Sequence, residues 1–187
     1  DIDRPTIEYA QGVDQAFRLV QADGNWLPYA DGLFHLTCCH YLLLWVDHPL
    51  RILNEMQRVT RPGGFVIAMA EPDHDSRIDY PPPLDELGEL QTRALKSQGA
   101  NTAMGRRLRA LFEEASLRDV EAGILGAQWT GSGSQPEKTE WTAIKSDLGD
   151  QLSPDQIEAY READQAAYQR GERVLFIPTF YAVGRVG

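Results

Sequence analysis

The sequence predicts an α/β protein built around a mostly parallel sheet. The central observation is the order of strand, helix, turn and strand between residues 34 and 70. Phe34–His40 has the composition of a strand, and Pro49–Thr60 carries apolar residues at helical spacing. After a Pro-Gly-Gly turn, Phe65–Ala70 is a continuous apolar run, which is typical of a strand covered on both faces, as in parallel sheets. The apolar face of the predicted helix comprises Leu50, Leu53, Met56 and Val59.

The turn itself has a physical explanation in the sequence. Pro62 ends the helix, because a helix rarely continues into the residue before proline. Gly63 and Gly64 allow positive φ angles, so the turn can be tight. Glu71-Pro72 then takes the chain out at the carboxyl edge of the sheet, where open α/β sheets bind ligands.

Composition limits the function classes. The 187 residues are 42% hydrophobic, which is enough for one domain over residues 1–187. A formal charge of −10 repels phosphate backbones, so we expect no nucleic-acid partner. The basic run Arg106–Arg109 is interpreted as a solvated helix face, with a local basic patch as the alternative. No apolar run has the length of a membrane span and no signal-peptide pattern is present, so we expect a cytoplasmic protein.

The cysteine and histidine pattern gives no indication of a metal site or a disulfide. Cys38 and Cys39 are adjacent within a predicted strand, and we expect a buried structural role for them. The sequence contains no CxxC or HExxH pattern, so it gives no support for a metal site.

Four motifs together resemble class I S-adenosylmethionine-dependent methyltransferases, in particular the small-molecule group that includes the ubiquinone and menaquinone methylases. They are Leu27-Pro28-Tyr29, Phe34-His35-Leu36-Thr37, Trp45-Val46-Asp47 and the stretch from Glu55 to Gly64. The resemblance covers Asp1 to Leu117. It implies a Rossmann-like three-layer sandwich with an antiparallel last strand at Arg173–Arg185, S-adenosylmethionine as the cofactor, and helical cap insertions at residues 73–115 and 130–170.

The same resemblance implies the residues that bind the cofactor. Asp1, with Ile2 beside it, matches the acidic position that binds the ribose hydroxyls, and Asp3 is the alternative. Asp23 and Gly24 match the position that contacts the adenine. Cys39, His40 and Tyr41 lie where family members contact the amino acid part. His40 is also a candidate general base, because a free imidazole titrates near neutrality, with a structural role as the alternative.

The resemblance also places a first strand and a glycine-rich GxGxG loop before Asp1. Neither is part of this sequence. A chain without that central strand leaves neighbouring strand edges unpaired. We therefore expect the native protein to have residues before Asp1.

The segment Asp73–Pro83 leaves the carboxyl edge of the sheet and should lie over the active site. It is polar and then stiffened by three consecutive prolines. His74, Arg77 and Tyr80 are its candidate contacts with the methyl acceptor, and a surface loop without a role is the alternative.

The remaining elements follow from periodicity and from capping signals. Ser153-Pro154-Asp155-Gln156 reads as a capping box that begins a helix reaching about Arg170, and Pro178 predicts a kink in the last strand. The other predicted elements are a helix at Pro5–Gln15, a strand at Phe17–Ala22, helices at Leu84–Gln98 and Met104–Ala115, a strand at Arg118–Trp129, a Gly/Ser linker at Thr130–Glu137 and a helix around Trp141.

The function expected from the sequence is methyl transfer from S-adenosylmethionine to a small molecule. Two alternatives are another dinucleotide-binding α/β enzyme and a non-catalytic binding or scaffold protein with the same fold. The acceptor, the atom methylated and the oligomeric state, a homodimer among the options, stay open.

Overall fold

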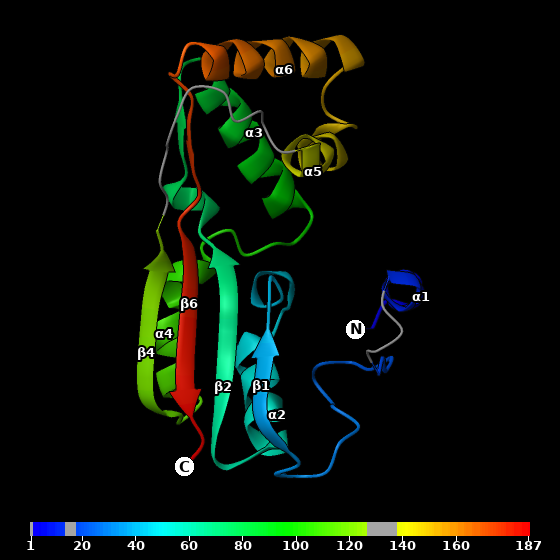
Figure 1. Cartoon of the computed structure of the whole chain (residues 1–187), viewed down its shortest axis with the longest axis vertical. Coiled ribbons are helices and arrows are strands. Elements are labelled where there is room, and N and C mark those ends of the chain that lie inside the picture. The colour runs from blue at the N-terminus through cyan, green and yellow to red at the C-terminus, as the bar shows by residue number, and fades with distance from the viewer. Residues whose placement is uncertain (1, 14–17, 127–137) are drawn as a thin grey trace.

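The computed structural model describes residues 2–13, 18–126 and 138–187. Its centre is a four-stranded sheet of β1 (Phe34–Cys39), β2 (Thr60–Pro72), β6 (Thr179–Arg185) and β4 (Arg118–Leu125), in that spatial order (Figure 1). β1 pairs with β2 in parallel, and β6 runs antiparallel to both β2 and β4. Three strands share one direction and the last strand is reversed, which confirms the predicted sheet.

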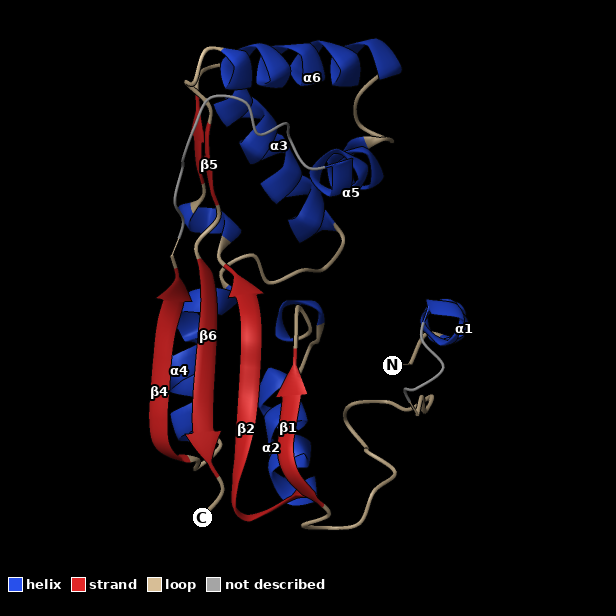
Figure 2. Ribbon diagram, in the orientation of Figure 1, coloured by secondary structure: helices blue, strands red, loops and turns tan. Residues whose placement is uncertain are grey.

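Two helices cover one face of this sheet (Figure 2). α2 (Pro49–Val59) packs on β1 and β2, and α4 (Met104–Glu114) packs on β2, β4 and β6. Burial of the apolar surface between sheet and helices stabilises this layer by about 25 cal/mol per Å². The main core includes Val66, Ala68, Leu53, Met56, Leu108 and Phe112.

The apolar run of β2 is covered on one face within the described residues. Val66 and Ala68 are fully buried against α2 and α4, whereas Phe65 and Met69 are each 44% exposed. The described part of the chain therefore does not meet the expectation of a strand covered on both faces. Of the three layers expected, it supplies the sheet and one helical layer. An apolar run indicates that both faces are apolar, but it does not identify what covers them.

The Pro-Gly-Gly motif lies inside β2 and does not form a separate turn before it. α2 ends at Val59 and β2 begins at the next residue, and the pairing register with β1 shifts opposite this motif. Gly63 has a φ of 78°, which favours glycine. A Cβ on Gly64 would lie 2.6 Å from the carbonyl oxygen of His35 in β1, so glycine lets the two strands approach. The predicted turn is thus an irregularity within the strand.

A second group of elements, called the cap below, lies beyond the carboxyl ends of β1, β2 and β4 (Figure 1). A short 3-10 helix, η2 (His74–Ser76), connects β2 to it. The cap has a core of its own formed by Leu84, Leu87, Trp141, Ile144, Leu148 and Ile157. Its elements are β3 (Ile78–Tyr80), antiparallel to β5 (Val174–Phe176), and the helices α3 (Leu84–Ser97), α5 (Lys138–Leu148) and α6 (Pro154–Gln169).

The C-terminal elements agree with the prediction in part. α6 begins with the predicted capping box, in which Ser153 and Gln156 exchange hydrogen bonds. The expected last strand is divided at Pro178, so that β5 belongs to the cap and β6 to the main sheet. α4, at the end of the first predicted cap segment, packs on the main sheet. The linker at residues 130–137 lies outside the described residues.

The N-terminal segment contains α1 (Arg4–Val13), which matches the predicted helix as far as the description extends. The strand predicted at residues 17–22 is wrong for residues 18–22, which form no regular element, while Phe17 lies outside the described residues. A strand needs a hydrogen-bonded neighbour, and the described part of the chain provides none for these residues. Local β propensity is therefore not sufficient there.

Candidate active site

A cavity of about 760 Å³ lies along β1 and the segments next to it. Its walls come from the N-terminal segment, from β1 with the loop that follows, and from α2. The predicted cofactor residues among its lining are Ile2, Asp23, Gly24, Cys39 and His40. Tyr41 does not line it and is 46% exposed, and Asp1 lies outside the described residues. The fold thus brings three separate predicted segments to one cavity.

The walls of this cavity suit a ligand with a flat apolar part and a positive charge. Much of the lining is apolar, while Asp23 and Asp47 add two carboxyl groups. Among the described residues that line the cavity, His40 is the one whose side chain can carry a positive charge. The volume is typical of a pocket for a small molecule or cofactor. The apolar lining includes Leu27, Phe34, Val46, Ile52 and Met56.

Asp23 and Gly24 have specific local environments. The carboxylate of Asp23 accepts hydrogen bonds from the backbone N–H of Asn25 at 2.8 Å and from its side-chain amide at 2.9 Å. These bonds, the backbone one first, lower the pKa of Asp23 below its usual value. A Cβ on Gly24 would lie 2.9 Å from Cδ1 of Ile52, so glycine permits close approach to α2. An ionised carboxylate is therefore available as a hydrogen-bond acceptor at the cavity wall.

An acidic and a basic residue on α2 hold the Leu-Pro-Tyr segment in place. Glu55 accepts a hydrogen bond from the backbone N–H of Leu27 at 2.8 Å. Arg58 donates to the carbonyl oxygens of Leu27 and Tyr29 at 3.0 and 2.9 Å, and to the carboxylate of Asp31 at 2.6 Å. The hydrogen bond from Arg58 lowers the pKa of Glu55. Two motifs that are separate in the sequence thus form one clamp beside Asp23.

The two cysteines differ, because successive side chains of a strand point to opposite faces. Cys39 is buried, and burial, together with the nearby carboxyl group of Glu71, raises the pKa of its thiol to about 12. Cys38 is exposed, so the expected buried role is wrong for this residue. Both line the cavity.

His40 and Tyr41 are exposed at the carboxyl end of β1. Their rings pack against each other with centroids 4.6 Å apart. Tyr41 has a φ of 51°, which is uncommon for a residue with a side chain. The loop after β1 therefore has a conformation that its local sequence does not favour.

A second cavity, of about 660 Å³, lies between η2, β3 and α3. The predicted acceptor residues His74 and Arg77 line it together with Thr92 and Lys96 of α3, whereas Tyr80 does not and is 53% exposed. It shares no lining residue with the first cavity. Burial, followed by the charge of Arg77, lowers the pKa of His74 to about 4. Its imidazole is therefore neutral near pH 7, and its buried Nδ1 has no hydrogen-bond partner.

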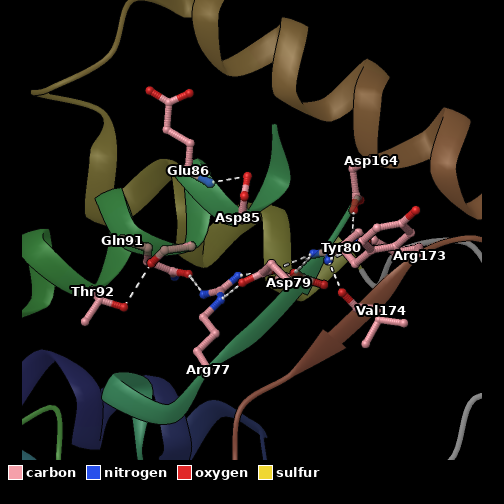
Figure 3. Close-up of polar contacts among 12 residues, drawn as sticks. Arg77, Asp79, Tyr80, Asp85, Glu86, Gln91, Thr92, Asp164, Arg173 and Val174 are labelled. Carbon is pink, nitrogen blue, oxygen red and sulfur yellow. Dashed lines mark hydrogen bonds and ion pairs between the residues drawn. The ribbon is translucent and has the colours of Figure 1, made fainter. Parts of the chain in front are cut away.

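Arg77 belongs to a buried polar network in the cap (Figure 3). Its side chain is 5% exposed, and its guanidinium pairs with the carboxylate of Asp79 and donates to the side-chain oxygen of Gln91. Gln91 in turn donates to Asp147 of α5 at 2.8 Å. The guanidinium of Arg77 is therefore engaged within the protein and forms a fixed wall of the second cavity.

The network continues to the helices of the cap through Arg173, whose side chain is 2% exposed. Arg173 pairs with Asp79 of β3 at 2.9 Å and with Asp164 of α6 at 2.6 Å. Asp164 also accepts a hydrogen bond from the indole N–H of Trp141 at 3.0 Å. Polar contacts thus join β3, α5 and α6 beneath the surface of the cap.

The basic run on α4 is exposed as expected, but one member has a specific partner. Arg106 pairs with the buried carboxylate of Asp73 and donates to the hydroxyl of Ser76 at 2.7 Å. Arg107 and Arg109 are exposed. Arg106 therefore fixes the connection between β2 and the cap.

In the part of the chain that the structure describes, no group of three or more His, Cys, Asp or Glu residues could hold a metal ion. None of the helices described there combines the length and the apolar character that crossing a membrane requires.

A mostly parallel sheet with a reversed last strand is typical of Rossmann-like α/β proteins. The cavity along β1 includes the carboxyl end of that strand, the edge at which open α/β sheets bind ligands. A solved structure of an S-adenosylmethionine-dependent methyltransferase from Thermotoga maritima has this fold. It matches with a TM-score of 0.59 and 14% identity, over 100% of this chain and 71% of that chain.

The sequence comparisons agree with this likeness in fold. Residues 1–68 match the model of a methyltransferase domain. An uncharacterized methyltransferase of Schizosaccharomyces pombe is 36% identical over 118 residues, which is 63% of this chain and 41% of that protein. A ubiquinone/menaquinone biosynthesis C-methyltransferase of Bdellovibrio bacteriovorus is 41% identical over 59 residues, 32% of this chain and 24% of that protein. The chain is therefore similar in sequence to methyltransferases over its N-terminal part, and it spans less than half the length of these two relatives.

S-adenosylmethionine, the cofactor of the methyltransferases that this chain resembles, has a chemistry that can be compared with the lining of the first cavity. It carries a sulfonium and an ammonium group against one carboxylate, so its net charge is positive, which the carboxylates of Asp23 and Asp47 complement. The apolar walls suit its adenine ring.

Proposed function

We propose that this protein transfers a methyl group from S-adenosylmethionine to a small-molecule acceptor. One observation supports this most strongly: Ile2, Asp23, Gly24, Cys39 and His40, chosen from sequence motifs, line a single cavity. When bound, S-adenosylmethionine supplies a methyl group already activated by the sulfonium. The chain then has to bind, orient and exclude water.

The proposed roles follow from the resemblance to class I methyltransferases, and the shared cavity supports them. Asp23 accepts a hydrogen bond from the adenine amino group, and Gly24 lets the backbone approach the ring. Cys39 and His40 form the wall for the amino acid part, with Tyr41 next to them. His40 is also the candidate for removing a proton from the acceptor. Asp1 and Ile2 are proposed to lie beside the ribose.

The second cavity is proposed to receive the acceptor or its distal part. His74 presents a neutral imidazole to that region, and Arg77 fixes its wall through Asp79. Tyr80, exposed on the adjoining strand, is proposed to contribute an outer contact. A polar lining of both charge signs favours a small polar acceptor over an apolar one.

Binding of S-adenosylhomocysteine, measured by calorimetry on the full-length protein, tests the cofactor part of the proposal. Asp23→Ala should weaken binding about tenfold, because the bound ligand would lose a carboxylate that accepts its hydrogen bond. Asp150→Ala is the control, because Asp150 is exposed and lines neither cavity. A folded, full-length protein that binds no cofactor would refute the proposal.

Acceptor kinetics test the second part. His74→Gln should change the rate of methylation while the affinity for S-adenosylhomocysteine stays within about a factor of three. The reverse pattern, weaker cofactor binding with unchanged acceptor kinetics, would place His74 in the cofactor site.

A further inference from the structure

Glu71 is a buried carboxyl group at the carboxyl end of β2. Its side chain has no exposed surface, and no Lys, Arg or His side chain among the described residues lies within ion-pair distance of it. It accepts three backbone hydrogen bonds instead, from the N–H groups of Leu42 and Leu43 at 2.9 Å and of Leu44 at 3.1 Å. A charged group removed from water requires such partners, and here they come from a segment 27 to 29 residues away.

These three N–H groups belong to the start of η1 (Leu43–Trp45), a single 3-10 turn in the loop after β1. The first N–H groups of a helix have no partner within the helix. Leu42, at the cap position, has no side chain that could accept them. Glu71 therefore caps this turn from the neighbouring strand, and the two oxygen atoms of its carboxylate divide the donors between them.

The capped loop forms part of the first cavity. Cys39 and His40 at its start, and Leu42 and Trp45 further along it, line the cavity. The backbone N–H of Tyr41 donates to the carbonyl oxygen of Ala70, next to Glu71, at 3.0 Å. Two consecutive residues of β2 thus hold the whole loop.

The loop needs such support from outside, because its own sequence does not favour its conformation. Tyr41 has positive φ, a state that costs about 1 kcal/mol or more for a residue with a side chain. Hydrogen bonds to a charged acceptor are roughly twice as strong as neutral ones. Glu71 supplies that acceptor for three consecutive N–H groups, so its removal frees the loop.

We propose that Glu71 is a positioning residue of the cofactor cavity, which holds the loop Cys39–Trp45 in the shape that binds S-adenosylmethionine. Glu71 does not touch the cofactor in this role, since it does not line the cavity. The inference rests on the proposed function, because it concerns the binding of that cofactor.

The test compares wild-type and Glu71→Gln full-length proteins for binding of S-adenosylhomocysteine. Glutamine keeps the shape of the side chain but turns one acceptor atom into a donor that faces a backbone N–H. We expect the dissociation constant to rise about tenfold or more, with an unchanged circular dichroism spectrum and faster hydrogen exchange at residues 42–44. Asp164→Asn, which alters an equally buried carboxylate in the cap, is the control and should lower stability without changing the dissociation constant.

The outcomes separate this inference from the proposed function. A wild-type protein that binds no cofactor refutes the proposed function and the inference with it. If the wild type binds and Glu71→Gln binds equally well, the inference alone is overturned. If Glu71→Gln does not fold, hydrogen exchange on the wild type decides. Slow exchange at residues 42–44 that the ligand slows further supports the inference, and fast exchange unaffected by the ligand overturns it.

Discussion

Arg173→Met should destabilise the cap selectively. The change removes the partner of Asp164, a carboxylate whose side chain is 2% exposed, and one of the two partners of Asp79. Breaking a buried ion pair typically costs about 3–5 kcal/mol, because an uncompensated charge stays buried. Asp164 keeps the indole N–H of Trp141 and Asp79 keeps Arg77, so we expect a loss of about 3 kcal/mol.

Urea unfolding measures the size of this loss, and native-state hydrogen exchange locates it. Amides of α5 and α6 should exchange faster, while β1 and β2 keep their protection, because the cap has its own core. Arg170→Met is the matched control, since Arg170 forms an exposed pair with Glu172 and its loss should cost at most about 1 kcal/mol.

A double variant tests the reasoning behind this prediction. Arg173→Met with Asp164→Leu removes both charges, so it should be more stable than Arg173→Met alone. An Arg173→Met protein as stable as the Arg170→Met control, or a double variant that loses the sum of the two single losses, would refute the reasoning.

Three further predictions concern the clamp, the second cavity and the cysteines. Arg58→Lys should weaken S-adenosylhomocysteine binding in calorimetry, because an ammonium cannot reach the two carbonyl oxygens and two carboxylates that the guanidinium fork contacts; unchanged affinity would contradict this. Burial lowers the pKa of His74 to about 4 from 6.5. As the pH falls from 6.5 to 4, His74 therefore becomes protonated in the unfolded state but stays neutral in the folded state, which lowers the stability of the fold. Over this pH interval the wild type should lose on the order of 3 kcal/mol of unfolding free energy relative to His74→Gln. Curves of unfolding free energy against pH that run parallel for the two proteins would contradict this prediction. Iodoacetamide should modify Cys38 before Cys39 in the folded protein, and S-adenosylhomocysteine should slow the reaction at Cys38; mass spectrometry showing equal labelling would contradict this.

The sequence predicted most elements near the sheet, because their signals are local. The spacing of Leu53, Met56 and Val59 fixes the buried face of α2, and the capping box at Ser153 fixes the start of α6. The prediction failed for residues 18–22, where strand formation depends on a neighbouring strand. Pairing between strands is a long-range property that no local pattern contains.

The candidate cofactor residues were also accessible from the sequence, because motifs mark them. Asp23 with Gly24 and Cys39 with His40 are separated in the chain and line one cavity, and their roles toward the cofactor stay a prediction. The sequence did not identify Glu71, which holds the loop after β1 at the wall of the first cavity. A carboxylate that ends an apolar strand, as Glu71 does, was the available signal, but its three partners lie 27 to 29 residues away.

By itself, the sequence determined the order of the main elements and the reversed last strand, because periodicity and turn chemistry are local properties of the chain. Tertiary structure alone decided which polar groups are paired. Arg77 was expected at the acceptor, yet folding places it beside Asp79 and Gln91, where a buried charge requires partners. It also decided that Glu71 caps the loop after β1, because hydrogen bonds across strands depend on which chain segments become neighbours.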